Sequence, residues 1–172
     1  SASNGFAIGT GSASINFNDN DILPYIQLSN TYSQNFDSLA NTGTAIPWTD
    51  NLILRGWYSS RTAYNAGNGS SNAGALYSFG TTGSTERALG SVGSGSTGTV
   101  YYGARFLNTS GTTITKLKIT YTGEQWRNGG NASAQTVNFA YQTGASIASL
   151  TAGTWTAVTN LNGKSPVTSA TE

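Results

Sequence analysis

Hydrophobic and polar residues alternate with a period of two along much of this chain. The alternation is clearest at residues 13–17, 100–106, 117–121, 137–141 and 154–157, with shorter candidates at 52–57 and 75–79. Each run predicts a β-strand with one buried face and one solvent-exposed face. The same alternation predicts that Tyr121 and Trp155 lie in the core. No window shows the 3.6-residue apolar period of an amphipathic helix, so the sequence predicts an all-β protein.

Clusters of Gly, Asn, Ser and Pro separate these runs and predict turns, at 41–43, 65–71, 81–84, 93–98, 108–111, 128–131 and 162–166. The Gly- and Ser-rich stretch 90–98 predicts a long loop, because the strands on either side are too short to form separate domains. Many short strands between such turns predict an antiparallel, jelly-roll-like β-sandwich. We expect this sandwich to span residues 23–172, preceded by an N-terminal extension strand within residues 1–22.

The amino-acid composition indicates where the protein functions. Charged residues make up 9% of the chain, against roughly 25% in typical soluble proteins, so Ser, Thr, Asn and Gly must supply the polar surface. This balance favours a secreted or cell-surface protein. A net charge of +1 gives no broad field that would attract nucleic acid. No stretch approaches the roughly 20 apolar residues that span a bilayer, so we expect no membrane insertion.

Candidate catalytic groups are scarce. The chain has no His and no Cys, which removes His-based triads, thiol nucleophiles and the usual zinc ligands. Seven carboxylates remain, and a glycosidase-like pair could be drawn from them, for example Glu86 with Glu124. Arg87 and Arg127 lie close to them in sequence, and carboxylate–guanidinium pairs that brace a loop are a commoner use of such residues. We therefore predict that the protein is not an enzyme and has no catalytic residues.

A short acidic stretch near the N-terminus is the one candidate for a metal site. Asp19 and Asp21 alternate with asparagines and offer oxygen ligands of the kind that Ca²⁺ accepts. The stretch lacks the glycine and the distal Glu of an EF-hand loop. A polar turn after a strand is the preferred interpretation, which leaves Ca²⁺ as the alternative and no other cofactor or metal expected.

Several aromatic residues are candidates for a saccharide site. Trp57, Tyr58 and Trp126 could form a platform for a sugar ring, with Glu124 and Arg127 supplying hydrogen bonds. The alternative is that the tryptophans fill the core, which is the commoner role in a β-sandwich. Trp126 leaves the strand pattern and is therefore the better surface candidate.

Six short motifs resemble a family of jelly-roll-like domains from secreted bacterial proteins. Those proteins often carry sorting signals, or attach the domain to extracellular nucleases and lamin-tail-type modules. The resemblance covers about residues 32–155 and implies a β-sandwich without established catalytic residues. The matching stretches are YSQNFD at 32–37, GWY at 56–58, ALYSFG at 75–80, ERALG at 86–90, YGARF at 102–106 and, most specific, YTGEQWR at 121–127.

The chain departs from that family at both ends. Relatives continue beyond the region of Trp155 into further strands with an acidic Asp-Asp-Phe-like segment, which is not found here. Residues 11–21 instead look like the closing strand of a Calx-β-type surface module. A sandwich without its last strand has an unpaired edge and an open groove. We expect Ala13, Ile15 and Phe17 to fill that groove, in their own chain or in a neighbouring copy.

Two hypotheses for function follow. The leading one is an extracellular structural or adhesive protein that forms a filament with copies of itself by strand complementation. The second is a carbohydrate-binding module of a larger secreted protein, with a polysaccharide as its partner.

Overall fold

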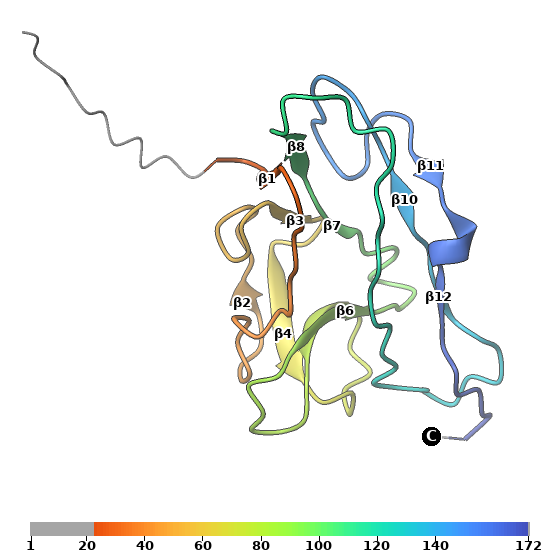
Figure 1. The fold of residues 1–172 in the computed structure, drawn as a ribbon. Coiled ribbons are helices and arrows are strands. Elements are labelled where there is room, and N and C mark those ends of the chain that lie inside the picture. The colour runs from red at the N-terminus through yellow and green to blue at the C-terminus, as the bar shows by residue number, and fades with distance from the viewer. Residues whose placement is uncertain (1–22, 172) are drawn as a thin grey trace, which may run out of the picture.

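A computed structural model describes residues 23–171 and shows an all-β, sandwich-like protein (Figure 1). A single-turn 3₁₀ helix, Thr159–Leu161, is the only helical element in this range. The predicted donor residues 13–17 lie outside it. The strands are β1 (Ile26–Leu28), β2 (Ile46–Pro47), β3 (Trp57–Ser59), β4 (Ala63–Gly67), β5 (Ala75–Phe79), β6 (Ala88–Val92), β7 (Tyr102–Ala104), β8 (Phe106–Asn108), β9 (Thr136–Val137), β10 (Ala140–Tyr141), β11 (Thr156–Ala157) and β12 (Gly163–Lys164).

The main sheet has four strands in the order β2-β4-β5-β6. β5 pairs antiparallel with β6 and parallel with β4. The other strands of the described chain form two-stranded ladders: β3 with β7, β9 with β12 and β10 with β11 are antiparallel, whereas β1 with β8 is parallel. Most pairs are thus antiparallel, as the sequence predicts, and two parallel pairs are added to them.

The core lies between the main sheet and the β3–β7 ladder. Trp57 of β3 and Tyr102 of β7 pack against the buried cluster from the second layer, which makes the arrangement sandwich-like. The buried cluster consists of Leu39, Trp48, Leu54, Tyr64 and Leu76.

The opposite face of β5 carries two stacked aromatic rings. Tyr77 and Phe79 alternate with Leu76 along the strand, and their ring centroids lie 4.8 Å apart at an interplanar angle of 12°. Gly90 of β6 is paired with Tyr77, and Gly67 of β4 with Phe79. A Cβ at Gly90 would lie 3.0 Å from the Phe79 ring. The glycines on both neighbouring strands therefore leave room for the rings.

Arg87 is buried beside the main sheet and is only 2% exposed. Its Nε donates to Ser78 Oγ at 2.9 Å, and one terminal nitrogen donates to the backbone oxygens of Ser78 and Gly67. Burial lowers the pKa of Arg87, and the charge of Glu86 partly opposes that effect. The backbone N–H of Arg87 donates to Asp37 Oδ1 at 3.1 Å. The guanidinium thus links strands through backbone oxygens rather than through a predicted pair with Glu86.

The predicted strand at 52–57 is wrong for residues 52–56, which form turns. Trp57 N–H donates to Leu54 O at 3.0 Å, and Asn51 and Gly56 have φ values of 62° and 71°. A Cβ at Gly56 would lie 2.5 Å from Ile26 Cγ1, so only glycine fits both the backbone and the contact.

Some of the remaining strand and turn predictions are confirmed and others are wrong. The predicted strand 75–79 is confirmed as β5, and the runs at 100–106 and 137–141 each give two short strands, β7 with β8 and β9 with β10. β4 extends into the predicted turn at 65–71, and β6 into the predicted loop at 90–98. Residues 117–121 form no strand.

Leu76→Ala tests whether β5 is the centre of the core. Leu76 is 0% exposed, so we expect the substitution to lower the free energy of unfolding by about 2–5 kcal/mol. Leu52→Ala is the matched control. Because Leu52 is 60% exposed, this substitution should lower the free energy of unfolding only slightly. Urea unfolding of both variants provides the measurement. Equal losses in the two would contradict the described core.

Candidate functional site

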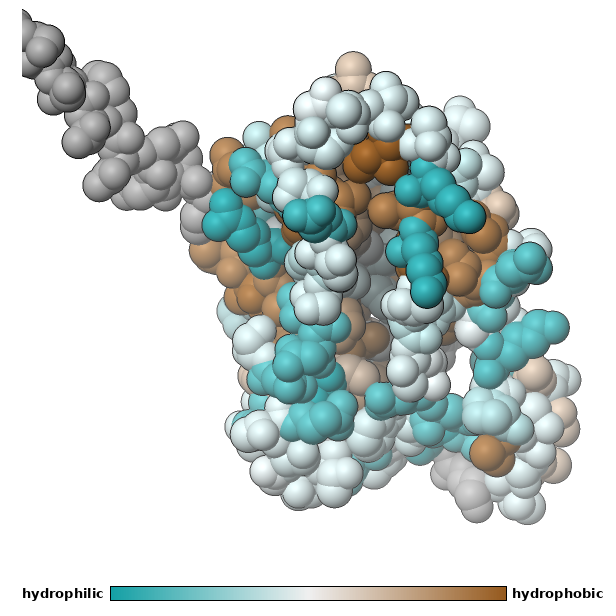
Figure 2. Space-filling model, in the orientation of Figure 1, coloured by the Kyte–Doolittle hydropathy of each residue, from teal (hydrophilic) through white to brown (hydrophobic). Residues whose placement is uncertain are grey.

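A long unpaired segment, residues 113–128, runs beside the C-terminal ladders (Figure 1). Within the described chain, the backbone N–H and C=O groups of residues 113–124 form no hydrogen bond with other protein groups. In the same orientation, the surface is hollowed beside this segment (Figure 2). Its backbone groups are therefore free to pair with an added strand.

The apolar residues of this segment are exposed. Leu117, Ile119 and Tyr121 share the odd-numbered face and are 54%, 37% and 50% exposed. The prediction that Tyr121 is a core residue is thus wrong, because no second strand covers its face. Lys116 and Lys118 occupy the even-numbered face and are also exposed. The alternation predicted a strand here. In the structure the segment has no strand partner, and its apolar side chains lie on one face only.

Side chains, rather than a backbone ladder, connect the segment to the C-terminal part of the chain. The Tyr121 hydroxyl donates to Leu161 O, and its ring stacks on Phe139 with centroids 6.4 Å apart. The Gln125 amide binds both backbone groups of Val167, with bonds of 2.9 Å to the carbonyl and 2.8 Å from the N–H. The segment is held in place while its strand-forming groups stay unpaired.

Three of the predicted ligand-binding residues come together at the end of this segment. Trp126 stacks on Phe79 with centroids 6.1 Å apart, and its Nε1 donates to Glu124 Oε2 at 2.9 Å. Arg127 donates to Ser70 O at 3.1 Å and reaches the neighbouring carbonyl of Gly69 at 3.4 Å. Trp126 is half-buried and extends the ring stack of β5 by one member.

The other two predicted residues lie on β3. Trp57 packs edge-on against Phe36, with ring centroids 4.9 Å apart, and contacts the core cluster. Its Nε1 donates to Tyr32 Oη at 2.8 Å, and Tyr58 Oη donates to Pro24 O at 2.5 Å. Trp57 is thus engaged in packing, as the core interpretation expects. Trp155, predicted as a core residue, is only half-buried, and its Nε1 donates to Ala152 O at 3.1 Å.

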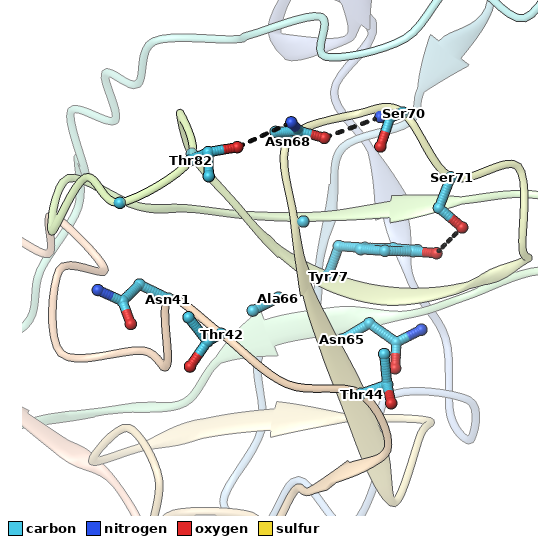
Figure 3. Close-up of a pocket in the computed structure, with 13 residues that line it drawn as sticks. Asn41, Thr42, Thr44, Asn65, Ala66, Asn68, Ser70, Ser71, Tyr77 and Thr82 are labelled. Atoms are coloured by element: carbon cyan, nitrogen blue, oxygen red, sulfur yellow. Dashed lines mark hydrogen bonds between the residues drawn. The ribbon is translucent and has the colours of Figure 1, made fainter.

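A polar groove of about 300 Å³ lies on the main sheet (Figure 3). Asn68 holds one wall, because its amide donates to Thr82 Oγ1 at 3.0 Å and its oxygen accepts from Ser70 N–H at 3.2 Å. The groove is lined by Asn41, Thr42, Thr44, Asn65, Ala66, Gly67, Asn68, Ser70, Ser71, Tyr77, Gly80, Thr82 and Gly83. No lining side chain is charged.

The chemistry of the groove suits a neutral ligand with many hydroxyl groups. Tyr77 is fixed at its base, since its hydroxyl donates to Ala73 O at 2.8 Å and lies 3.2 Å from Ser71 Oγ. The side chains of Asn41, Thr42 and Thr44 make no hydrogen bond within the described chain. Sequence reasoning missed this groove, because its residues come from stretches that are separate in sequence and were predicted mostly as turns, apart from Tyr77 in the predicted strand 75–79.

The described residues contain no group of three or more His, Cys, Asp and Glu side chains able to hold a metal ion. Asp19 and Asp21, the predicted alternative for Ca²⁺, lie outside the described range. No helix within residues 23–171 is long and apolar enough to cross a membrane.

Within residues 23–171, fold and site together define an all-β, sandwich-like protein with an unpaired apolar segment at 113–124 and an uncharged groove on the main sheet. In comparisons with known proteins, no family model, curated protein or solved structure matches the chain. The resemblance to secreted jelly-roll-like domains therefore stays a prediction.

Tyr102 gives a pH-dependent test of the packing next to the open edge. Burial raises the pKa of the Tyr102 hydroxyl above its ordinary value, and nearby Tyr121 raises it further. The folded state therefore favours the neutral phenol. Its contribution to stability is complete below the unfolded pKa of about 10 and is lost as the pH rises through the folded pKa.

We expect Tyr102→Phe to lose less stability than the wild type between pH 8 and pH 11. Tyr101→Phe, at a ring that is 46% exposed, should behave like the wild type. Denaturant unfolding at both pH values is the measurement. If all three proteins lose the same free energy of unfolding, Tyr102 is not shielded as described.

Proposed function

We propose that this protein is a non-enzymatic, extracellular structural protein that assembles with copies of itself by β-strand complementation. The observation that carries the proposal is the open edge of residues 113–124, whose backbone is unpaired and whose Leu117, Ile119 and Tyr121 are exposed. An extended edge of this kind is a template for another strand.

Addition of a strand would satisfy two requirements at once. It would pair the free backbone groups of the segment, and it would cover apolar side chains that otherwise remain in water. When each copy supplies a strand to the next, the contact is heterologous, and its repetition produces an open filament. The low charge of the chain and its resemblance to secreted jelly-roll-like domains support an extracellular setting.

Leu117→Glu tests the proposal directly. We expect the wild type to form filaments in electron micrographs and to show a melting temperature that rises with protein concentration. Leu117→Glu should remain monomeric at the same concentrations, because a charge on the apolar face opposes its burial. Leu117 is 54% exposed, so the melting temperature of the monomer should change little.

Leu52→Glu is the control, since Leu52 is 60% exposed and lies away from the edge, in the turn before β3. It should assemble like the wild type. A wild-type protein that is monomeric, with a melting temperature independent of concentration, would refute strand complementation between subunits.

The polar groove favours a second candidate function, a carbohydrate-binding module. Its uncharged amide and hydroxyl lining fits a neutral polysaccharide. A neutral polysaccharide would form no ion pair with the groove, so its binding should be insensitive to salt.

Binding to a panel of neutral polysaccharides, followed by titration calorimetry, tests this candidate. Asn41→Ala and Thr42→Val should each weaken a positive interaction, because both residues line the groove with side chains free to bind. Thr143→Val is the control, as Thr143 is exposed elsewhere. Binding that is unchanged in both groove variants would exclude the groove as the site.

A further inference from the structure

We propose that the occupant of the open edge is the segment 13–17 of a second copy of this chain, paired antiparallel with residues 117–121 so that Ile15 lies opposite Ile119. This inference rests on the proposed function and names the donor, the acceptor and their register. Three features of the chain support it: matching apolar patterns, complementary charge and the position of residue 23.

The apolar patterns match in this register. Phe17 pairs with Leu117, Ile15 with Ile119, and the small Ala13 with the large Tyr121. All three pairs fall on the odd-numbered face, and polar residues pair with polar residues on the other face. A shift of one residue would place every apolar donor side chain on the wrong face, so the pattern selects the register. Antiparallel pairing is also the more frequent arrangement of adjacent strands.

The charges of the two segments are opposite. Residues 1–22 contain Asp19 and Asp21 and no Lys or Arg, whereas residues 106–123 contain Lys116 and Lys118 and no Asp or Glu. In the proposed register, Asn18 lies opposite Lys116, and Asp19 is the next residue of the donor. The carboxylates thus lie within a few residues of both lysines, and their opposite charges attract the donor to the acceptor segment. The acceptor segment of another copy would bring lysines next to lysines, so its pairing at this edge is disfavoured.

The position of residue 23 favours a donor from another copy. In the view of Figure 1, the red start of the described chain leads into β1 from the side away from segment 113–128. A donor from the same chain would have to turn back past β1 within residues 18–22. Five extended residues span at most about 18 Å, and a reversal shortens that reach. A second copy has no such restriction.

Disulfide trapping tests the register, because the native chain has no Cys. Ser14 and Thr120 lie directly opposite each other in the proposed pairing, on the polar face. We would mix Ser14→Cys with Thr120→Cys under mild oxidation and run non-reducing gels. Directly opposed residues have Cα atoms about 4.5–5.5 Å apart, within disulfide range. We expect a cross-linked heterodimer. Ser14→Cys mixed with Thr42→Cys, at an exposed threonine in the polar groove, should give none.

The doubly substituted chain, with both Ser14→Cys and Thr120→Cys, distinguishes donation between copies from donation within one. Donation between copies gives a ladder of covalent multimers, whereas donation within a chain gives an oxidised monomer and would overturn the inference. Filaments that form without the Ser14–Thr120 cross-link would also overturn it, while leaving the proposed function intact. Absence of filaments in the wild type would instead refute the proposed function.

Charge exchange provides an independent readout. We expect Lys116→Asp with Lys118→Asp to weaken assembly several-fold, and added Asp19→Lys with Asp21→Lys to restore it. Wild-type assembly should weaken as salt increases, because salt screens the attraction between donor and acceptor. The variant without rescue should show the opposite dependence, because its two acidic segments repel each other and salt screens that repulsion. Salt-independent assembly of the wild type, or no rescue by the exchange, would contradict the role given to these four residues.

Discussion

The burial of β5 on both faces is the constraint on which the rest of this structure depends. Leu76 is 0% exposed on one face, and Tyr77 and Phe79 stack on the other. The first face joins the main sheet to the β3–β7 layer, and the second receives Trp126 from the far end of segment 113–128. With no cysteine and few charged residues, the protein depends on apolar burial around this strand for its stability.

Segment 113–124 contains a run, residues 117–121, that was predicted as a strand just as β5 was, but its environment is the opposite of that of β5. β5 has a hydrogen-bonded neighbour at each edge, whereas the backbone of this segment pairs with nothing in the described chain. Leu117 and Ile119 remain exposed because burial of one face requires a covering layer, and a paired strand is what aligns such a layer. The exposure of this segment therefore contrasts with the burial of β5 at the centre of the main sheet.

This contrast also explains what the sequence could predict. Alternation is a local property, so it correctly predicted the all-β class and the strand at 75–79. It indicates which side chains share a face but not whether that face is covered, and Tyr121 was therefore wrongly predicted as a core residue. Gly67 and Gly90 resemble turn residues in sequence, yet they lie on strands opposite the rings of Phe79 and Tyr77.

The polar groove could not be predicted for a related reason. Its walls come from residues 41–44, 65–71 and 80–83, which are separate in sequence. They meet because β4 and β5 are parallel although only residues 68–74 connect them, so this connection must run back along the sheet. Parallel neighbours usually need a crossover of a dozen residues or more, and no local pattern signals a shorter one.

An open apolar edge must be protected from pairing with another copy of itself, and the same lysines that attract a donor provide that protection. Lys116 and Lys118 lie on the even-numbered face of the acceptor segment and are exposed, and residues 106–123 contain no acidic residue. Two such edges placed side by side would bring like charges together, which disfavours edge-to-edge aggregation. A donor that carries carboxylates next to its apolar residues meets no such repulsion. The charge pattern thus favours head-to-tail assembly over symmetric pairing of acceptor edges.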